Sequence, residues 1–126
     1  RNALNGQSNN FTVIAGNGTQ GSASHLLNEP CGIFVDENLT LYVADCFNDR
    51  IQMFRRDQRN GTTIAGNGTT GTISLNRPIS VVLDNNGYLF IADRWNNRIV
   101  GSGPNGFRCL INCGSGTGGP STGILN

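Results

Sequence analysis

Two stretches of this 126-residue chain repeat one pattern, and that repetition decides the fold. Residues 30–54 read PCGIFVDENLTLYVADCFNDRIQMF, and residues 78–102 read PISVVLDNNGYLFIADRWNNRIVGS. The second stretch begins 48 positions after the first, and five residues return at that spacing: Pro30 and Pro78, Asp36 and Asp84, Asp45 and Asp93, Arg50 and Arg98, Ile51 and Ile99. A period between about 20 and 50 residues is typical of repeat proteins in which similar units stack side by side.

Each repeat predicts four short strands. We expect them at residues 32–36, 41–45, 50–54 and 62–66, and again at 80–84, 88–93, 98–102 and 107–112. Residues 33–35 and 41–44 are apolar without alternation, which indicates sheets that are covered on both faces. Clusters of Gly, Pro and Asn interrupt every helical pattern, so we predict no helix. Four strands in a unit of about 40–50 residues are typical of a β-propeller blade.

The repeated text resembles the NHL repeat. The resemblance rests on PCGIFVD at 30–36, LYVAD at 41–45 and NDRIQMF at 48–54, and on FIAD at 90–93 and NNRI at 96–99 in the second repeat. It implies an all-β chain built from four-stranded antiparallel blades. In this family the strand after the proline lies nearest the central channel, and the fourth strand is outermost.

The same resemblance divides the chain. Residues 30–77 are the first blade with its following loop, residues 78–119 are the second blade, and residues 120–126 begin a further repeat. Residues 1–29 hold a loop and, at 11–16, the outer strand of a preceding blade, since VIAGNGT at 13–19 returns as TIAGNGT at 63–69. Two blades cannot close a ring. We therefore expect an incomplete propeller, either a segment of a longer repeat protein or a subunit that completes itself with further copies.

The first two cysteines suggest a disulfide. An antiparallel hairpin that pairs Asp36 with Leu41 sets Cys31 opposite Cys46. Directly opposed strand residues have Cα atoms about 4.5–5.5 Å apart, within reach of a disulfide. Both cysteines are missing together from the second repeat, as expected of a bonded pair. The alternative is a pair of buried free thiols.

The other two cysteines, Cys109 and Cys113, are only four positions apart. In a straight strand that spacing spans about 13 Å, so a bond requires the chain to turn between them. The Gly-rich sequence after Cys113 is compatible with such a turn. A zinc site is the alternative, but no histidine lies nearby and the cysteine spacing does not fit one. Two local cysteine pairs indicate an oxidising compartment.

Five N-x-Thr sequons support an extracellular glycoprotein. They lie at Asn10, Asn17, Asn38, Asn60 and Asn67. Four of them form two repeat-related pairs, 10 with 60 and 17 with 67. The alternative is that Asn-Gly pairs serve only as turns. We expect N-linked glycans as the attached groups and no other cofactor.

Composition excludes several classes of protein. The net charge is +1 and all nine basic residues are Arg, so the chain lacks the basic surplus of a nucleic-acid binder and any lysine for Schiff-base or P-loop chemistry. No apolar stretch approaches the roughly 20 residues that would cross a bilayer, and because the sequence shows no signal-peptide pattern we expect a mature product or a fragment. The single histidine, His25, supports neither a multi-histidine metal site nor a nucleophile–base pair, so we predict no enzymatic activity.

Recurring polar residues predict structural contacts rather than a metal site. We expect Asp45 with Arg50, and Asp93 with Arg98, to link the blades; calcium in the channel is the alternative for the aspartates. Three Gly-x-Gly-x-x-Gly matches, at 16–21, 66–71 and 114–119, lack the helix that a dinucleotide site requires, so we assign them to turns.

Two other groups raise the question of a ligand. Phe47 and Trp95 occupy related loop positions, 48 apart, and are either packing residues or rim contacts for a ligand. A small basic cluster is either a solvated turn or a nucleic-acid contact; because Asp57 interrupts it and the second repeat lacks it, we favour the turn for Arg55, Arg56 and Arg59.

The sequence thus predicts a non-catalytic, extracellular NHL-type segment that acts as a binding scaffold or assembly module. Its expected partners are further copies or blades and an extracellular protein or glycan, with no nucleic acid and no membrane insertion. One alternative is a self-assembling subunit of an extracellular fibre or surface layer, since unclosed blades expose sheet edges. Another is a fragment of a propeller lyase or hydrolase whose catalytic residues lie in other blades.

Overall fold

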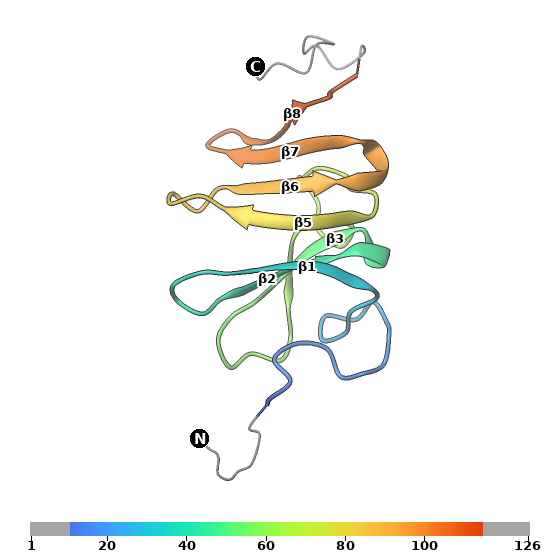
Figure 1. Cartoon of the computed structure of the whole chain (residues 1–126), viewed down its shortest axis with the longest axis vertical. Coiled ribbons are helices and arrows are strands. Elements are labelled where there is room, and N and C mark those ends of the chain that lie inside the picture. The colour runs from blue at the N-terminus through green and yellow to red at the C-terminus, as the bar shows by residue number, and fades with distance from the viewer. Residues whose placement is uncertain (1–10, 115–126) are drawn as a thin grey trace.

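The computed structural model describes residues 11–114, which form two four-stranded antiparallel sheets (Figure 1). In each sheet the strands pair in the order of the sequence. Sheet 1 contains β1 (Pro30–Val35), β2 (Leu41–Asp45), β3 (Arg50–Phe54) and β4 (Thr62–Gly66). Sheet 2 contains β5 (Pro78–Leu83), β6 (Leu89–Asp93), β7 (Arg98–Gly103) and β8 (Gly106–Ile111). Short 3₁₀ turns join the second strand to the third: η2 (Cys46–Asn48) and η3 (Arg94–Asn96).

The all-β prediction is confirmed, and the two sheets are consistent with blades of an incomplete β-propeller. Strands β2, β3 and β4 have the bounds expected from the sequence. The two proline-led strands begin at Pro30 and Pro78 themselves, two residues earlier than expected. Within residues 11–114, helical structure is limited to the 3₁₀ turns, because the Asn and Gly clusters leave room for no longer helix.

Aspartate side chains shape the first hairpin of each sheet. Asp36 Oδ1 accepts hydrogen bonds from the backbone N–H groups of Asn38 and Thr40, each at 2.9 Å. Asp84 Oδ1 accepts from Asn86 at 2.8 Å and Tyr88 at 3.0 Å. An aspartate that bonds the backbone two residues ahead stabilises a tight turn. Asp36 therefore belongs to the turn, and Leu41 pairs with Val35 instead of with Asp36.

A β-bulge follows at the other end of this hairpin. Gly32 pairs with Ala44, but Pro30 pairs with Asp45, so Cys31 is the extra residue of the bulge. The same shift occurs between Pro78 and Ser80 in sheet 2. The predicted register, which set Cys31 directly opposite Cys46, is therefore wrong. A regular ladder cannot be assumed where a bulge adds one residue to one strand.

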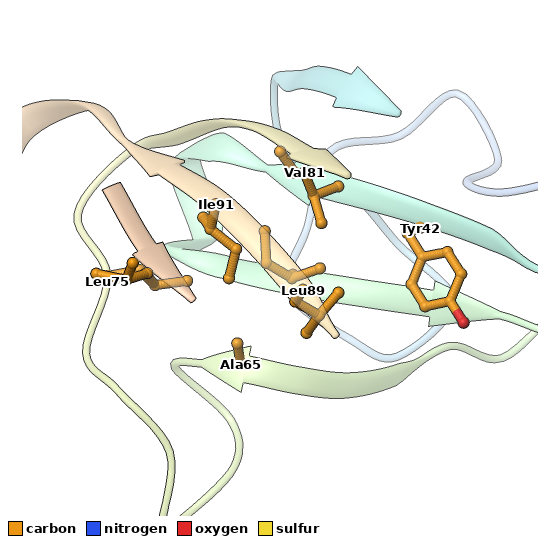
Figure 2. Packing of buried hydrophobic residues seen from close by; sticks show 9 residues of the cluster. Tyr42, Ala65, Leu75, Val81, Leu89 and Ile91 are labelled. Atoms are coloured by element: carbon orange, nitrogen blue, oxygen red, sulfur yellow. The ribbon is translucent and has the colours of Figure 1, made fainter. Parts of the chain in front are cut away.

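The hydrophobic core lies between the two sheets. Tyr42, Ala44, Ile51 and Ala65 of sheet 1 face Val81, Leu89, Ile91 and Val100 of sheet 2, with Leu75 from the connecting loop among them. Figure 2 shows these side chains meeting between the strands. Strand β5 lies against β1 and β2, so the sheets approach most closely through their first strands. This burial is the main stabilising contribution in the described residues, at about 25 cal/mol per Å² of apolar area.

Gly32 marks the closest approach of the two sheets. A Cβ atom at this position would lie 2.5 Å from the carbonyl oxygen of Ile79 and 3.1 Å from the Cα of Ser80. Any larger residue would have to push β1 away from β5. The position that corresponds to Gly32 in sheet 2 is occupied by Ser80, 48 residues later.

Residues 11–16 do not form the outer strand predicted for them. A strand needs a hydrogen-bonded neighbour, and residues 11–114 supply no inner strands of a preceding blade with which this segment could pair. Figure 1 places the segment beside sheet 1, on the side away from sheet 2. The predicted further repeat at 120–126 and the last glycine motif at 114–119, apart from Gly114, lie outside the described residues.

Candidate functional site

The same polar arrangement occurs in each sheet, at the connection between the second and third strands. The second strand ends in a buried aspartate, a 3₁₀ turn follows, and an arginine opens the third strand. The Nε atom of Arg50 donates to Oδ2 of Asp45 at 2.8 Å, and that of Arg98 donates to Oδ2 of Asp93 at 2.8 Å. The structure thus joins the two Asp–Arg pairs that the sequence analysis had set together.

Further donors satisfy the Asp45 carboxylate. Asn48 Nδ2 donates to Oδ2 at 2.8 Å, and the backbone N–H of Asn28 donates to Oδ1 at 2.8 Å. In sheet 2, Asn96 and Asn76 make the equivalent bonds to Asp93. A buried carboxylate needs such partners, because an unpaired charge out of water is costly.

The arginines hold the loop that precedes each blade. The guanidinium of Arg50 donates to three loop carbonyl oxygens, 2.9–3.1 Å away, at Ser22, Ala23 and Leu26. Arg98 donates to the carbonyl oxygen of Ser74 at 2.8 Å. Both Asp–Arg pairs therefore act as clamps on the loops. Within residues 11–114 no group of three or more His, Cys, Asp or Glu residues could hold a metal ion.

An aromatic pair lies on the surface beside these clamps. Phe47 in η2 is 50% exposed, and Trp95 in η3 is 58% exposed. The guanidinium carbon of Arg77, from the loop before β5, lies 4.5 Å from the ring centroid of Phe47 and 5.1 Å from that of Trp95. One arginine therefore stacks with aromatic rings from two neighbouring sheets. We call Phe47, Asp49, Arg77 and Trp95 the rim surface.

Asp49 fixes the arginine of the rim surface. Its Oδ1 accepts from the backbone N–H of Arg77 at 2.8 Å and from Nη1 at 3.1 Å. Arg77 Nη1 also donates to the carbonyl oxygen of Phe47 at 3.5 Å, whereas its buried Nε has no partner among the described atoms. Rings held at set positions by a central cation lose little freedom when they bind another surface.

Sequence reasoning found the two aromatic rings but missed Arg77. For Phe47 and Trp95 the sequence left packing and ligand contact open; in the structure each packs on Arg77 and exposes about half of its surface. The available signal was the position of Arg77 directly before Pro78, where the loop meets the blade. The contact itself depends on how the sheets stack, which one repeat read alone does not show.

The cysteines divide into one bonded pair and one free pair. Cys109 and Cys113 form a disulfide with Cα atoms 5.6 Å apart, and Asn112, with φ of 62°, provides the turn that this bond needs. The bond predicted between Cys31 and Cys46 is not formed: both are free thiols, Cys31 exposed and Cys46 buried. The bulge takes Cys31 out of the ladder position directly opposite Cys46, although the two thiols remain hydrogen-bonded to each other.

Burial also affects the chemistry of Cys46. It raises the pKa of the Cys46 thiol from 9.0 to about 11, and a hydrogen bond with the Cys31 thiol adds to the increase. Cys31 itself donates weakly to the carbonyl oxygen of Glu29, with the sulfur 3.4 Å from that oxygen. The two thiols are therefore neighbours that differ in access to solvent.

The remaining predicted residues lie on the surface. Four sequon asparagines are exposed: Asn17, Asn38, Asn60 and Asn67. Asn10 lies outside the described residues. His25 is exposed in the loop before β1, and so are Arg55, Arg56 and Arg59 after β3. In residues 11–114 no helix is long and apolar enough to cross a membrane.

Comparison with known families bears on the second repeat. Residues 75–101 match the NHL repeat. The match begins at Leu75 in the inter-blade loop and ends at Gly101 in β7, so it contains the Asp93–Arg98 clamp and Trp95. The match supports an NHL repeat in this part of the chain. No curated protein matches the chain.

Proposed function

We propose that this chain is a non-catalytic, extracellular NHL-type module that binds a protein partner through its rim surface. The observation that carries the proposal is the Phe47–Arg77–Trp95 stack, which exposes two large rings and holds them in place. Tryptophan, arginine and other aromatic side chains are enriched where protein interfaces concentrate their binding energy. Proteins are the usual partners of NHL repeats, which fits the match to residues 75–101.

The chemistry of the rim surface favours a peptide-bearing partner. Both rings offer apolar area together with their π-faces, and Asp49 partly balances the charge of Arg77. Such a surface suits main-chain amides and side chains with cationic or apolar groups. The proposal assigns no reaction to the rim surface and no cofactor to the chain beyond N-linked glycans.

Matched variants test the rim surface. Phe47→Ala with Trp95→Ala removes both rings, while Ile111→Ala removes an exposed apolar side chain from the outer strand β8 as a control. Each immobilised chain is exposed to extracellular proteins of its own source, and bound proteins are quantified by mass spectrometry. We expect a partner that the control retains and the double variant loses. Equal recovery of every bound protein on all three chains would overturn the rim assignment.

Support for the extracellular location comes from the exposed sequons and from the Cys109–Cys113 disulfide. Disulfides persist mainly in oxidising compartments, and N-glycans are attached on the secretory route. Peptide mass mapping of material from the natural source, before and after enzymatic removal of glycans, tests this part. We expect modification at Asn38, which lies in the β1–β2 hairpin, and at Asn60 before β4. Unmodified asparagine at every sequon would contradict an extracellular glycoprotein.

A further inference from the structure

Sheet 1 has an apolar face that points away from sheet 2 and is largely exposed. The equivalent face of sheet 2 is covered by sheet 1. In sheet 2 the residues that face sheet 1 include Val81 and Leu89, both buried. Their counterparts 48 positions earlier are Ile33, which is 64% exposed, and Leu41, which is partly exposed. The loop residue Leu75 is buried in the core as well. These two positions are thus covered in sheet 2 and open in sheet 1, whereas Val43 of sheet 1 is buried like its counterpart Ile91.

We call the open surface of sheet 1 the docking face; its residues are Leu27, Ile33, Val35 and Leu41. It lines a groove of about 630 Å³, to which Val13 and Ile14 of the N-terminal segment also contribute. The counterparts of the four docking-face residues are Leu75, Val81, Leu83 and Leu89, which pack between the sheets. The internal interface therefore shows what kind of surface covers such a face: the opposite face of a blade of the same repeat.

The chain carries that opposite face, uncovered, at its other end. Sheet 1 meets sheet 2 through residues that include Phe34, Tyr42 and Ile51. Their counterparts in sheet 2 are Val82, which is 49% exposed, Phe90, which is exposed, and Ile99, which is partly exposed. We call these three residues of sheet 2 the free face. It keeps the apolar character of the surface that already covers sheet 2 internally.

We propose that a second copy of this chain places its free face on the docking face. The contact would repeat the internal one, with Phe90 of one copy in the place of Tyr42 and Val82 in the place of Phe34. Because the two faces differ, the contact is head-to-tail, so each added copy leaves one docking face and one free face open. Assembly then continues past the dimer, to a ring where the rotation closes and to a filament where it does not.

Two features of the chain affect how closely the two copies can pack at this contact. Residues 11–16 line the groove but form no strand, so β8 of the incoming copy displaces them without breaking a ladder. Ser80 stands where the internal interface has Gly32, the position at which a Cβ atom would lie 2.5 Å from the carbonyl oxygen of Ile79. The corresponding oxygen of the receiving copy belongs to Cys31. The Ser80 side chain therefore holds the copies slightly apart, and Ser80→Gly strengthens association.

Complementation of two single variants tests a head-to-tail contact directly. Ile33→Asp disables the docking face only, and Val82→Asp disables the free face only. We expect each variant to sediment as a monomer and their mixture to form a 1:1 dimer that grows no further. The wild-type chain should instead form larger species as its concentration rises, and Ser80→Gly should do so at lower concentration. The test measures sedimentation rather than recovery of a bound partner, so a failed rim assignment leaves it intact.

Circular dichroism of each variant checks that it remains folded. Ser80→Gly is a second safeguard, because its expected gain in association does not depend on damage to a core. A wild-type chain that stays monomeric up to about 100 μM, well above the micromolar range of ordinary specific association, would overturn the proposal. A monomeric chain is the result expected if the docking face instead binds a further blade of the same polypeptide. Mixed variants that remain monomeric would also overturn it, as would a dimer formed by either variant alone.

Discussion

The two blades hold their incoming loops with the same Asp–Arg pair but in different ways. Arg50, whose side chain is 7% exposed, donates to three carbonyl oxygens of the loop before β1. Arg98, whose side chain is 20% exposed, donates to one carbonyl oxygen of the loop before β5. That second loop is fixed instead by Leu75, which is buried between the sheets. A loop that lies between two blades can rely on apolar packing, whereas one with a single blade beside it relies on polar bonds.

Replacing each arginine with alanine should give the largest difference in stability between the two blades. In Arg50→Ala the buried Asp45 carboxylate loses its counter-ion and the loop loses three bonds, so we expect a loss of about 3–5 kcal/mol in the free energy of unfolding. Arg98→Ala should cost less, about 1–3 kcal/mol, because water reaches that pair more easily. Urea denaturation measures both, and Arg55→Ala, exposed after β3, serves as a control with little effect. Equal losses for the two variants would contradict the comparison.

Truncating the equivalent loop leucines should give the reverse order. Leu75→Ala opens a cavity between the sheets, and we expect a loss of about 2–4 kcal/mol in the free energy of unfolding. Leu27→Ala removes a side chain that is only partly buried, so its cost should stay below about 1 kcal/mol in the monomer. The measurement is the same denaturation at a concentration low enough to exclude self-association. A larger loss at Leu27 would mean that the first loop is also held mainly by packing.

The two 3₁₀ turns also differ, because only η2 contains a residue that should make the stability of the fold depend on pH. Cys46 in η2 is buried, whereas the counterpart in η3 is the exposed Arg94. Because the folded state raises the pKa of Cys46 from 9.0 to about 11, its thiol contributes stability that is complete below pH 9 and lost as the pH rises toward 11. Replacing Cys46 with Ala should remove that part of the pH dependence.

Alkylation distinguishes the two thiols independently. At pH 8 we expect iodoacetamide to modify exposed Cys31 while Cys46 reacts only after unfolding. Cys31→Ser should then leave the native chain unlabelled. Rapid labelling of Cys46 in the folded Cys31→Ser variant would show that its burial is incomplete.

The repeat pattern was sufficient to predict the strands but not their pairing in detail. Gly and Asn clusters delimit each apolar run, so most strand bounds follow from local sequence. The register failed at Asp36 because its side chain binds the turn backbone, and at Cys31 because the bulge adds a residue. Neither event changes the hydrophobic pattern on which the prediction rested.

The candidate site was less accessible to prediction for a different reason. Phe47 and Trp95 were found because they recur at the repeat spacing. Arg77 was not, since its contacts with Phe47 and Asp49 cross from one blade to the next. The strand expected at 11–16 failed similarly, because a strand depends on neighbours that its own residues do not specify.

The residue before each blade's proline has a left-handed backbone, with φ of 57° at Glu29 and 54° at Arg77. One is acidic and the other basic, so the backbone shape is kept while the charge reverses. Neither side chain belongs to the hydrophobic core, but Arg77 holds the two rings of the rim surface. The charge beside the first strand therefore differs in sign between the two described blades.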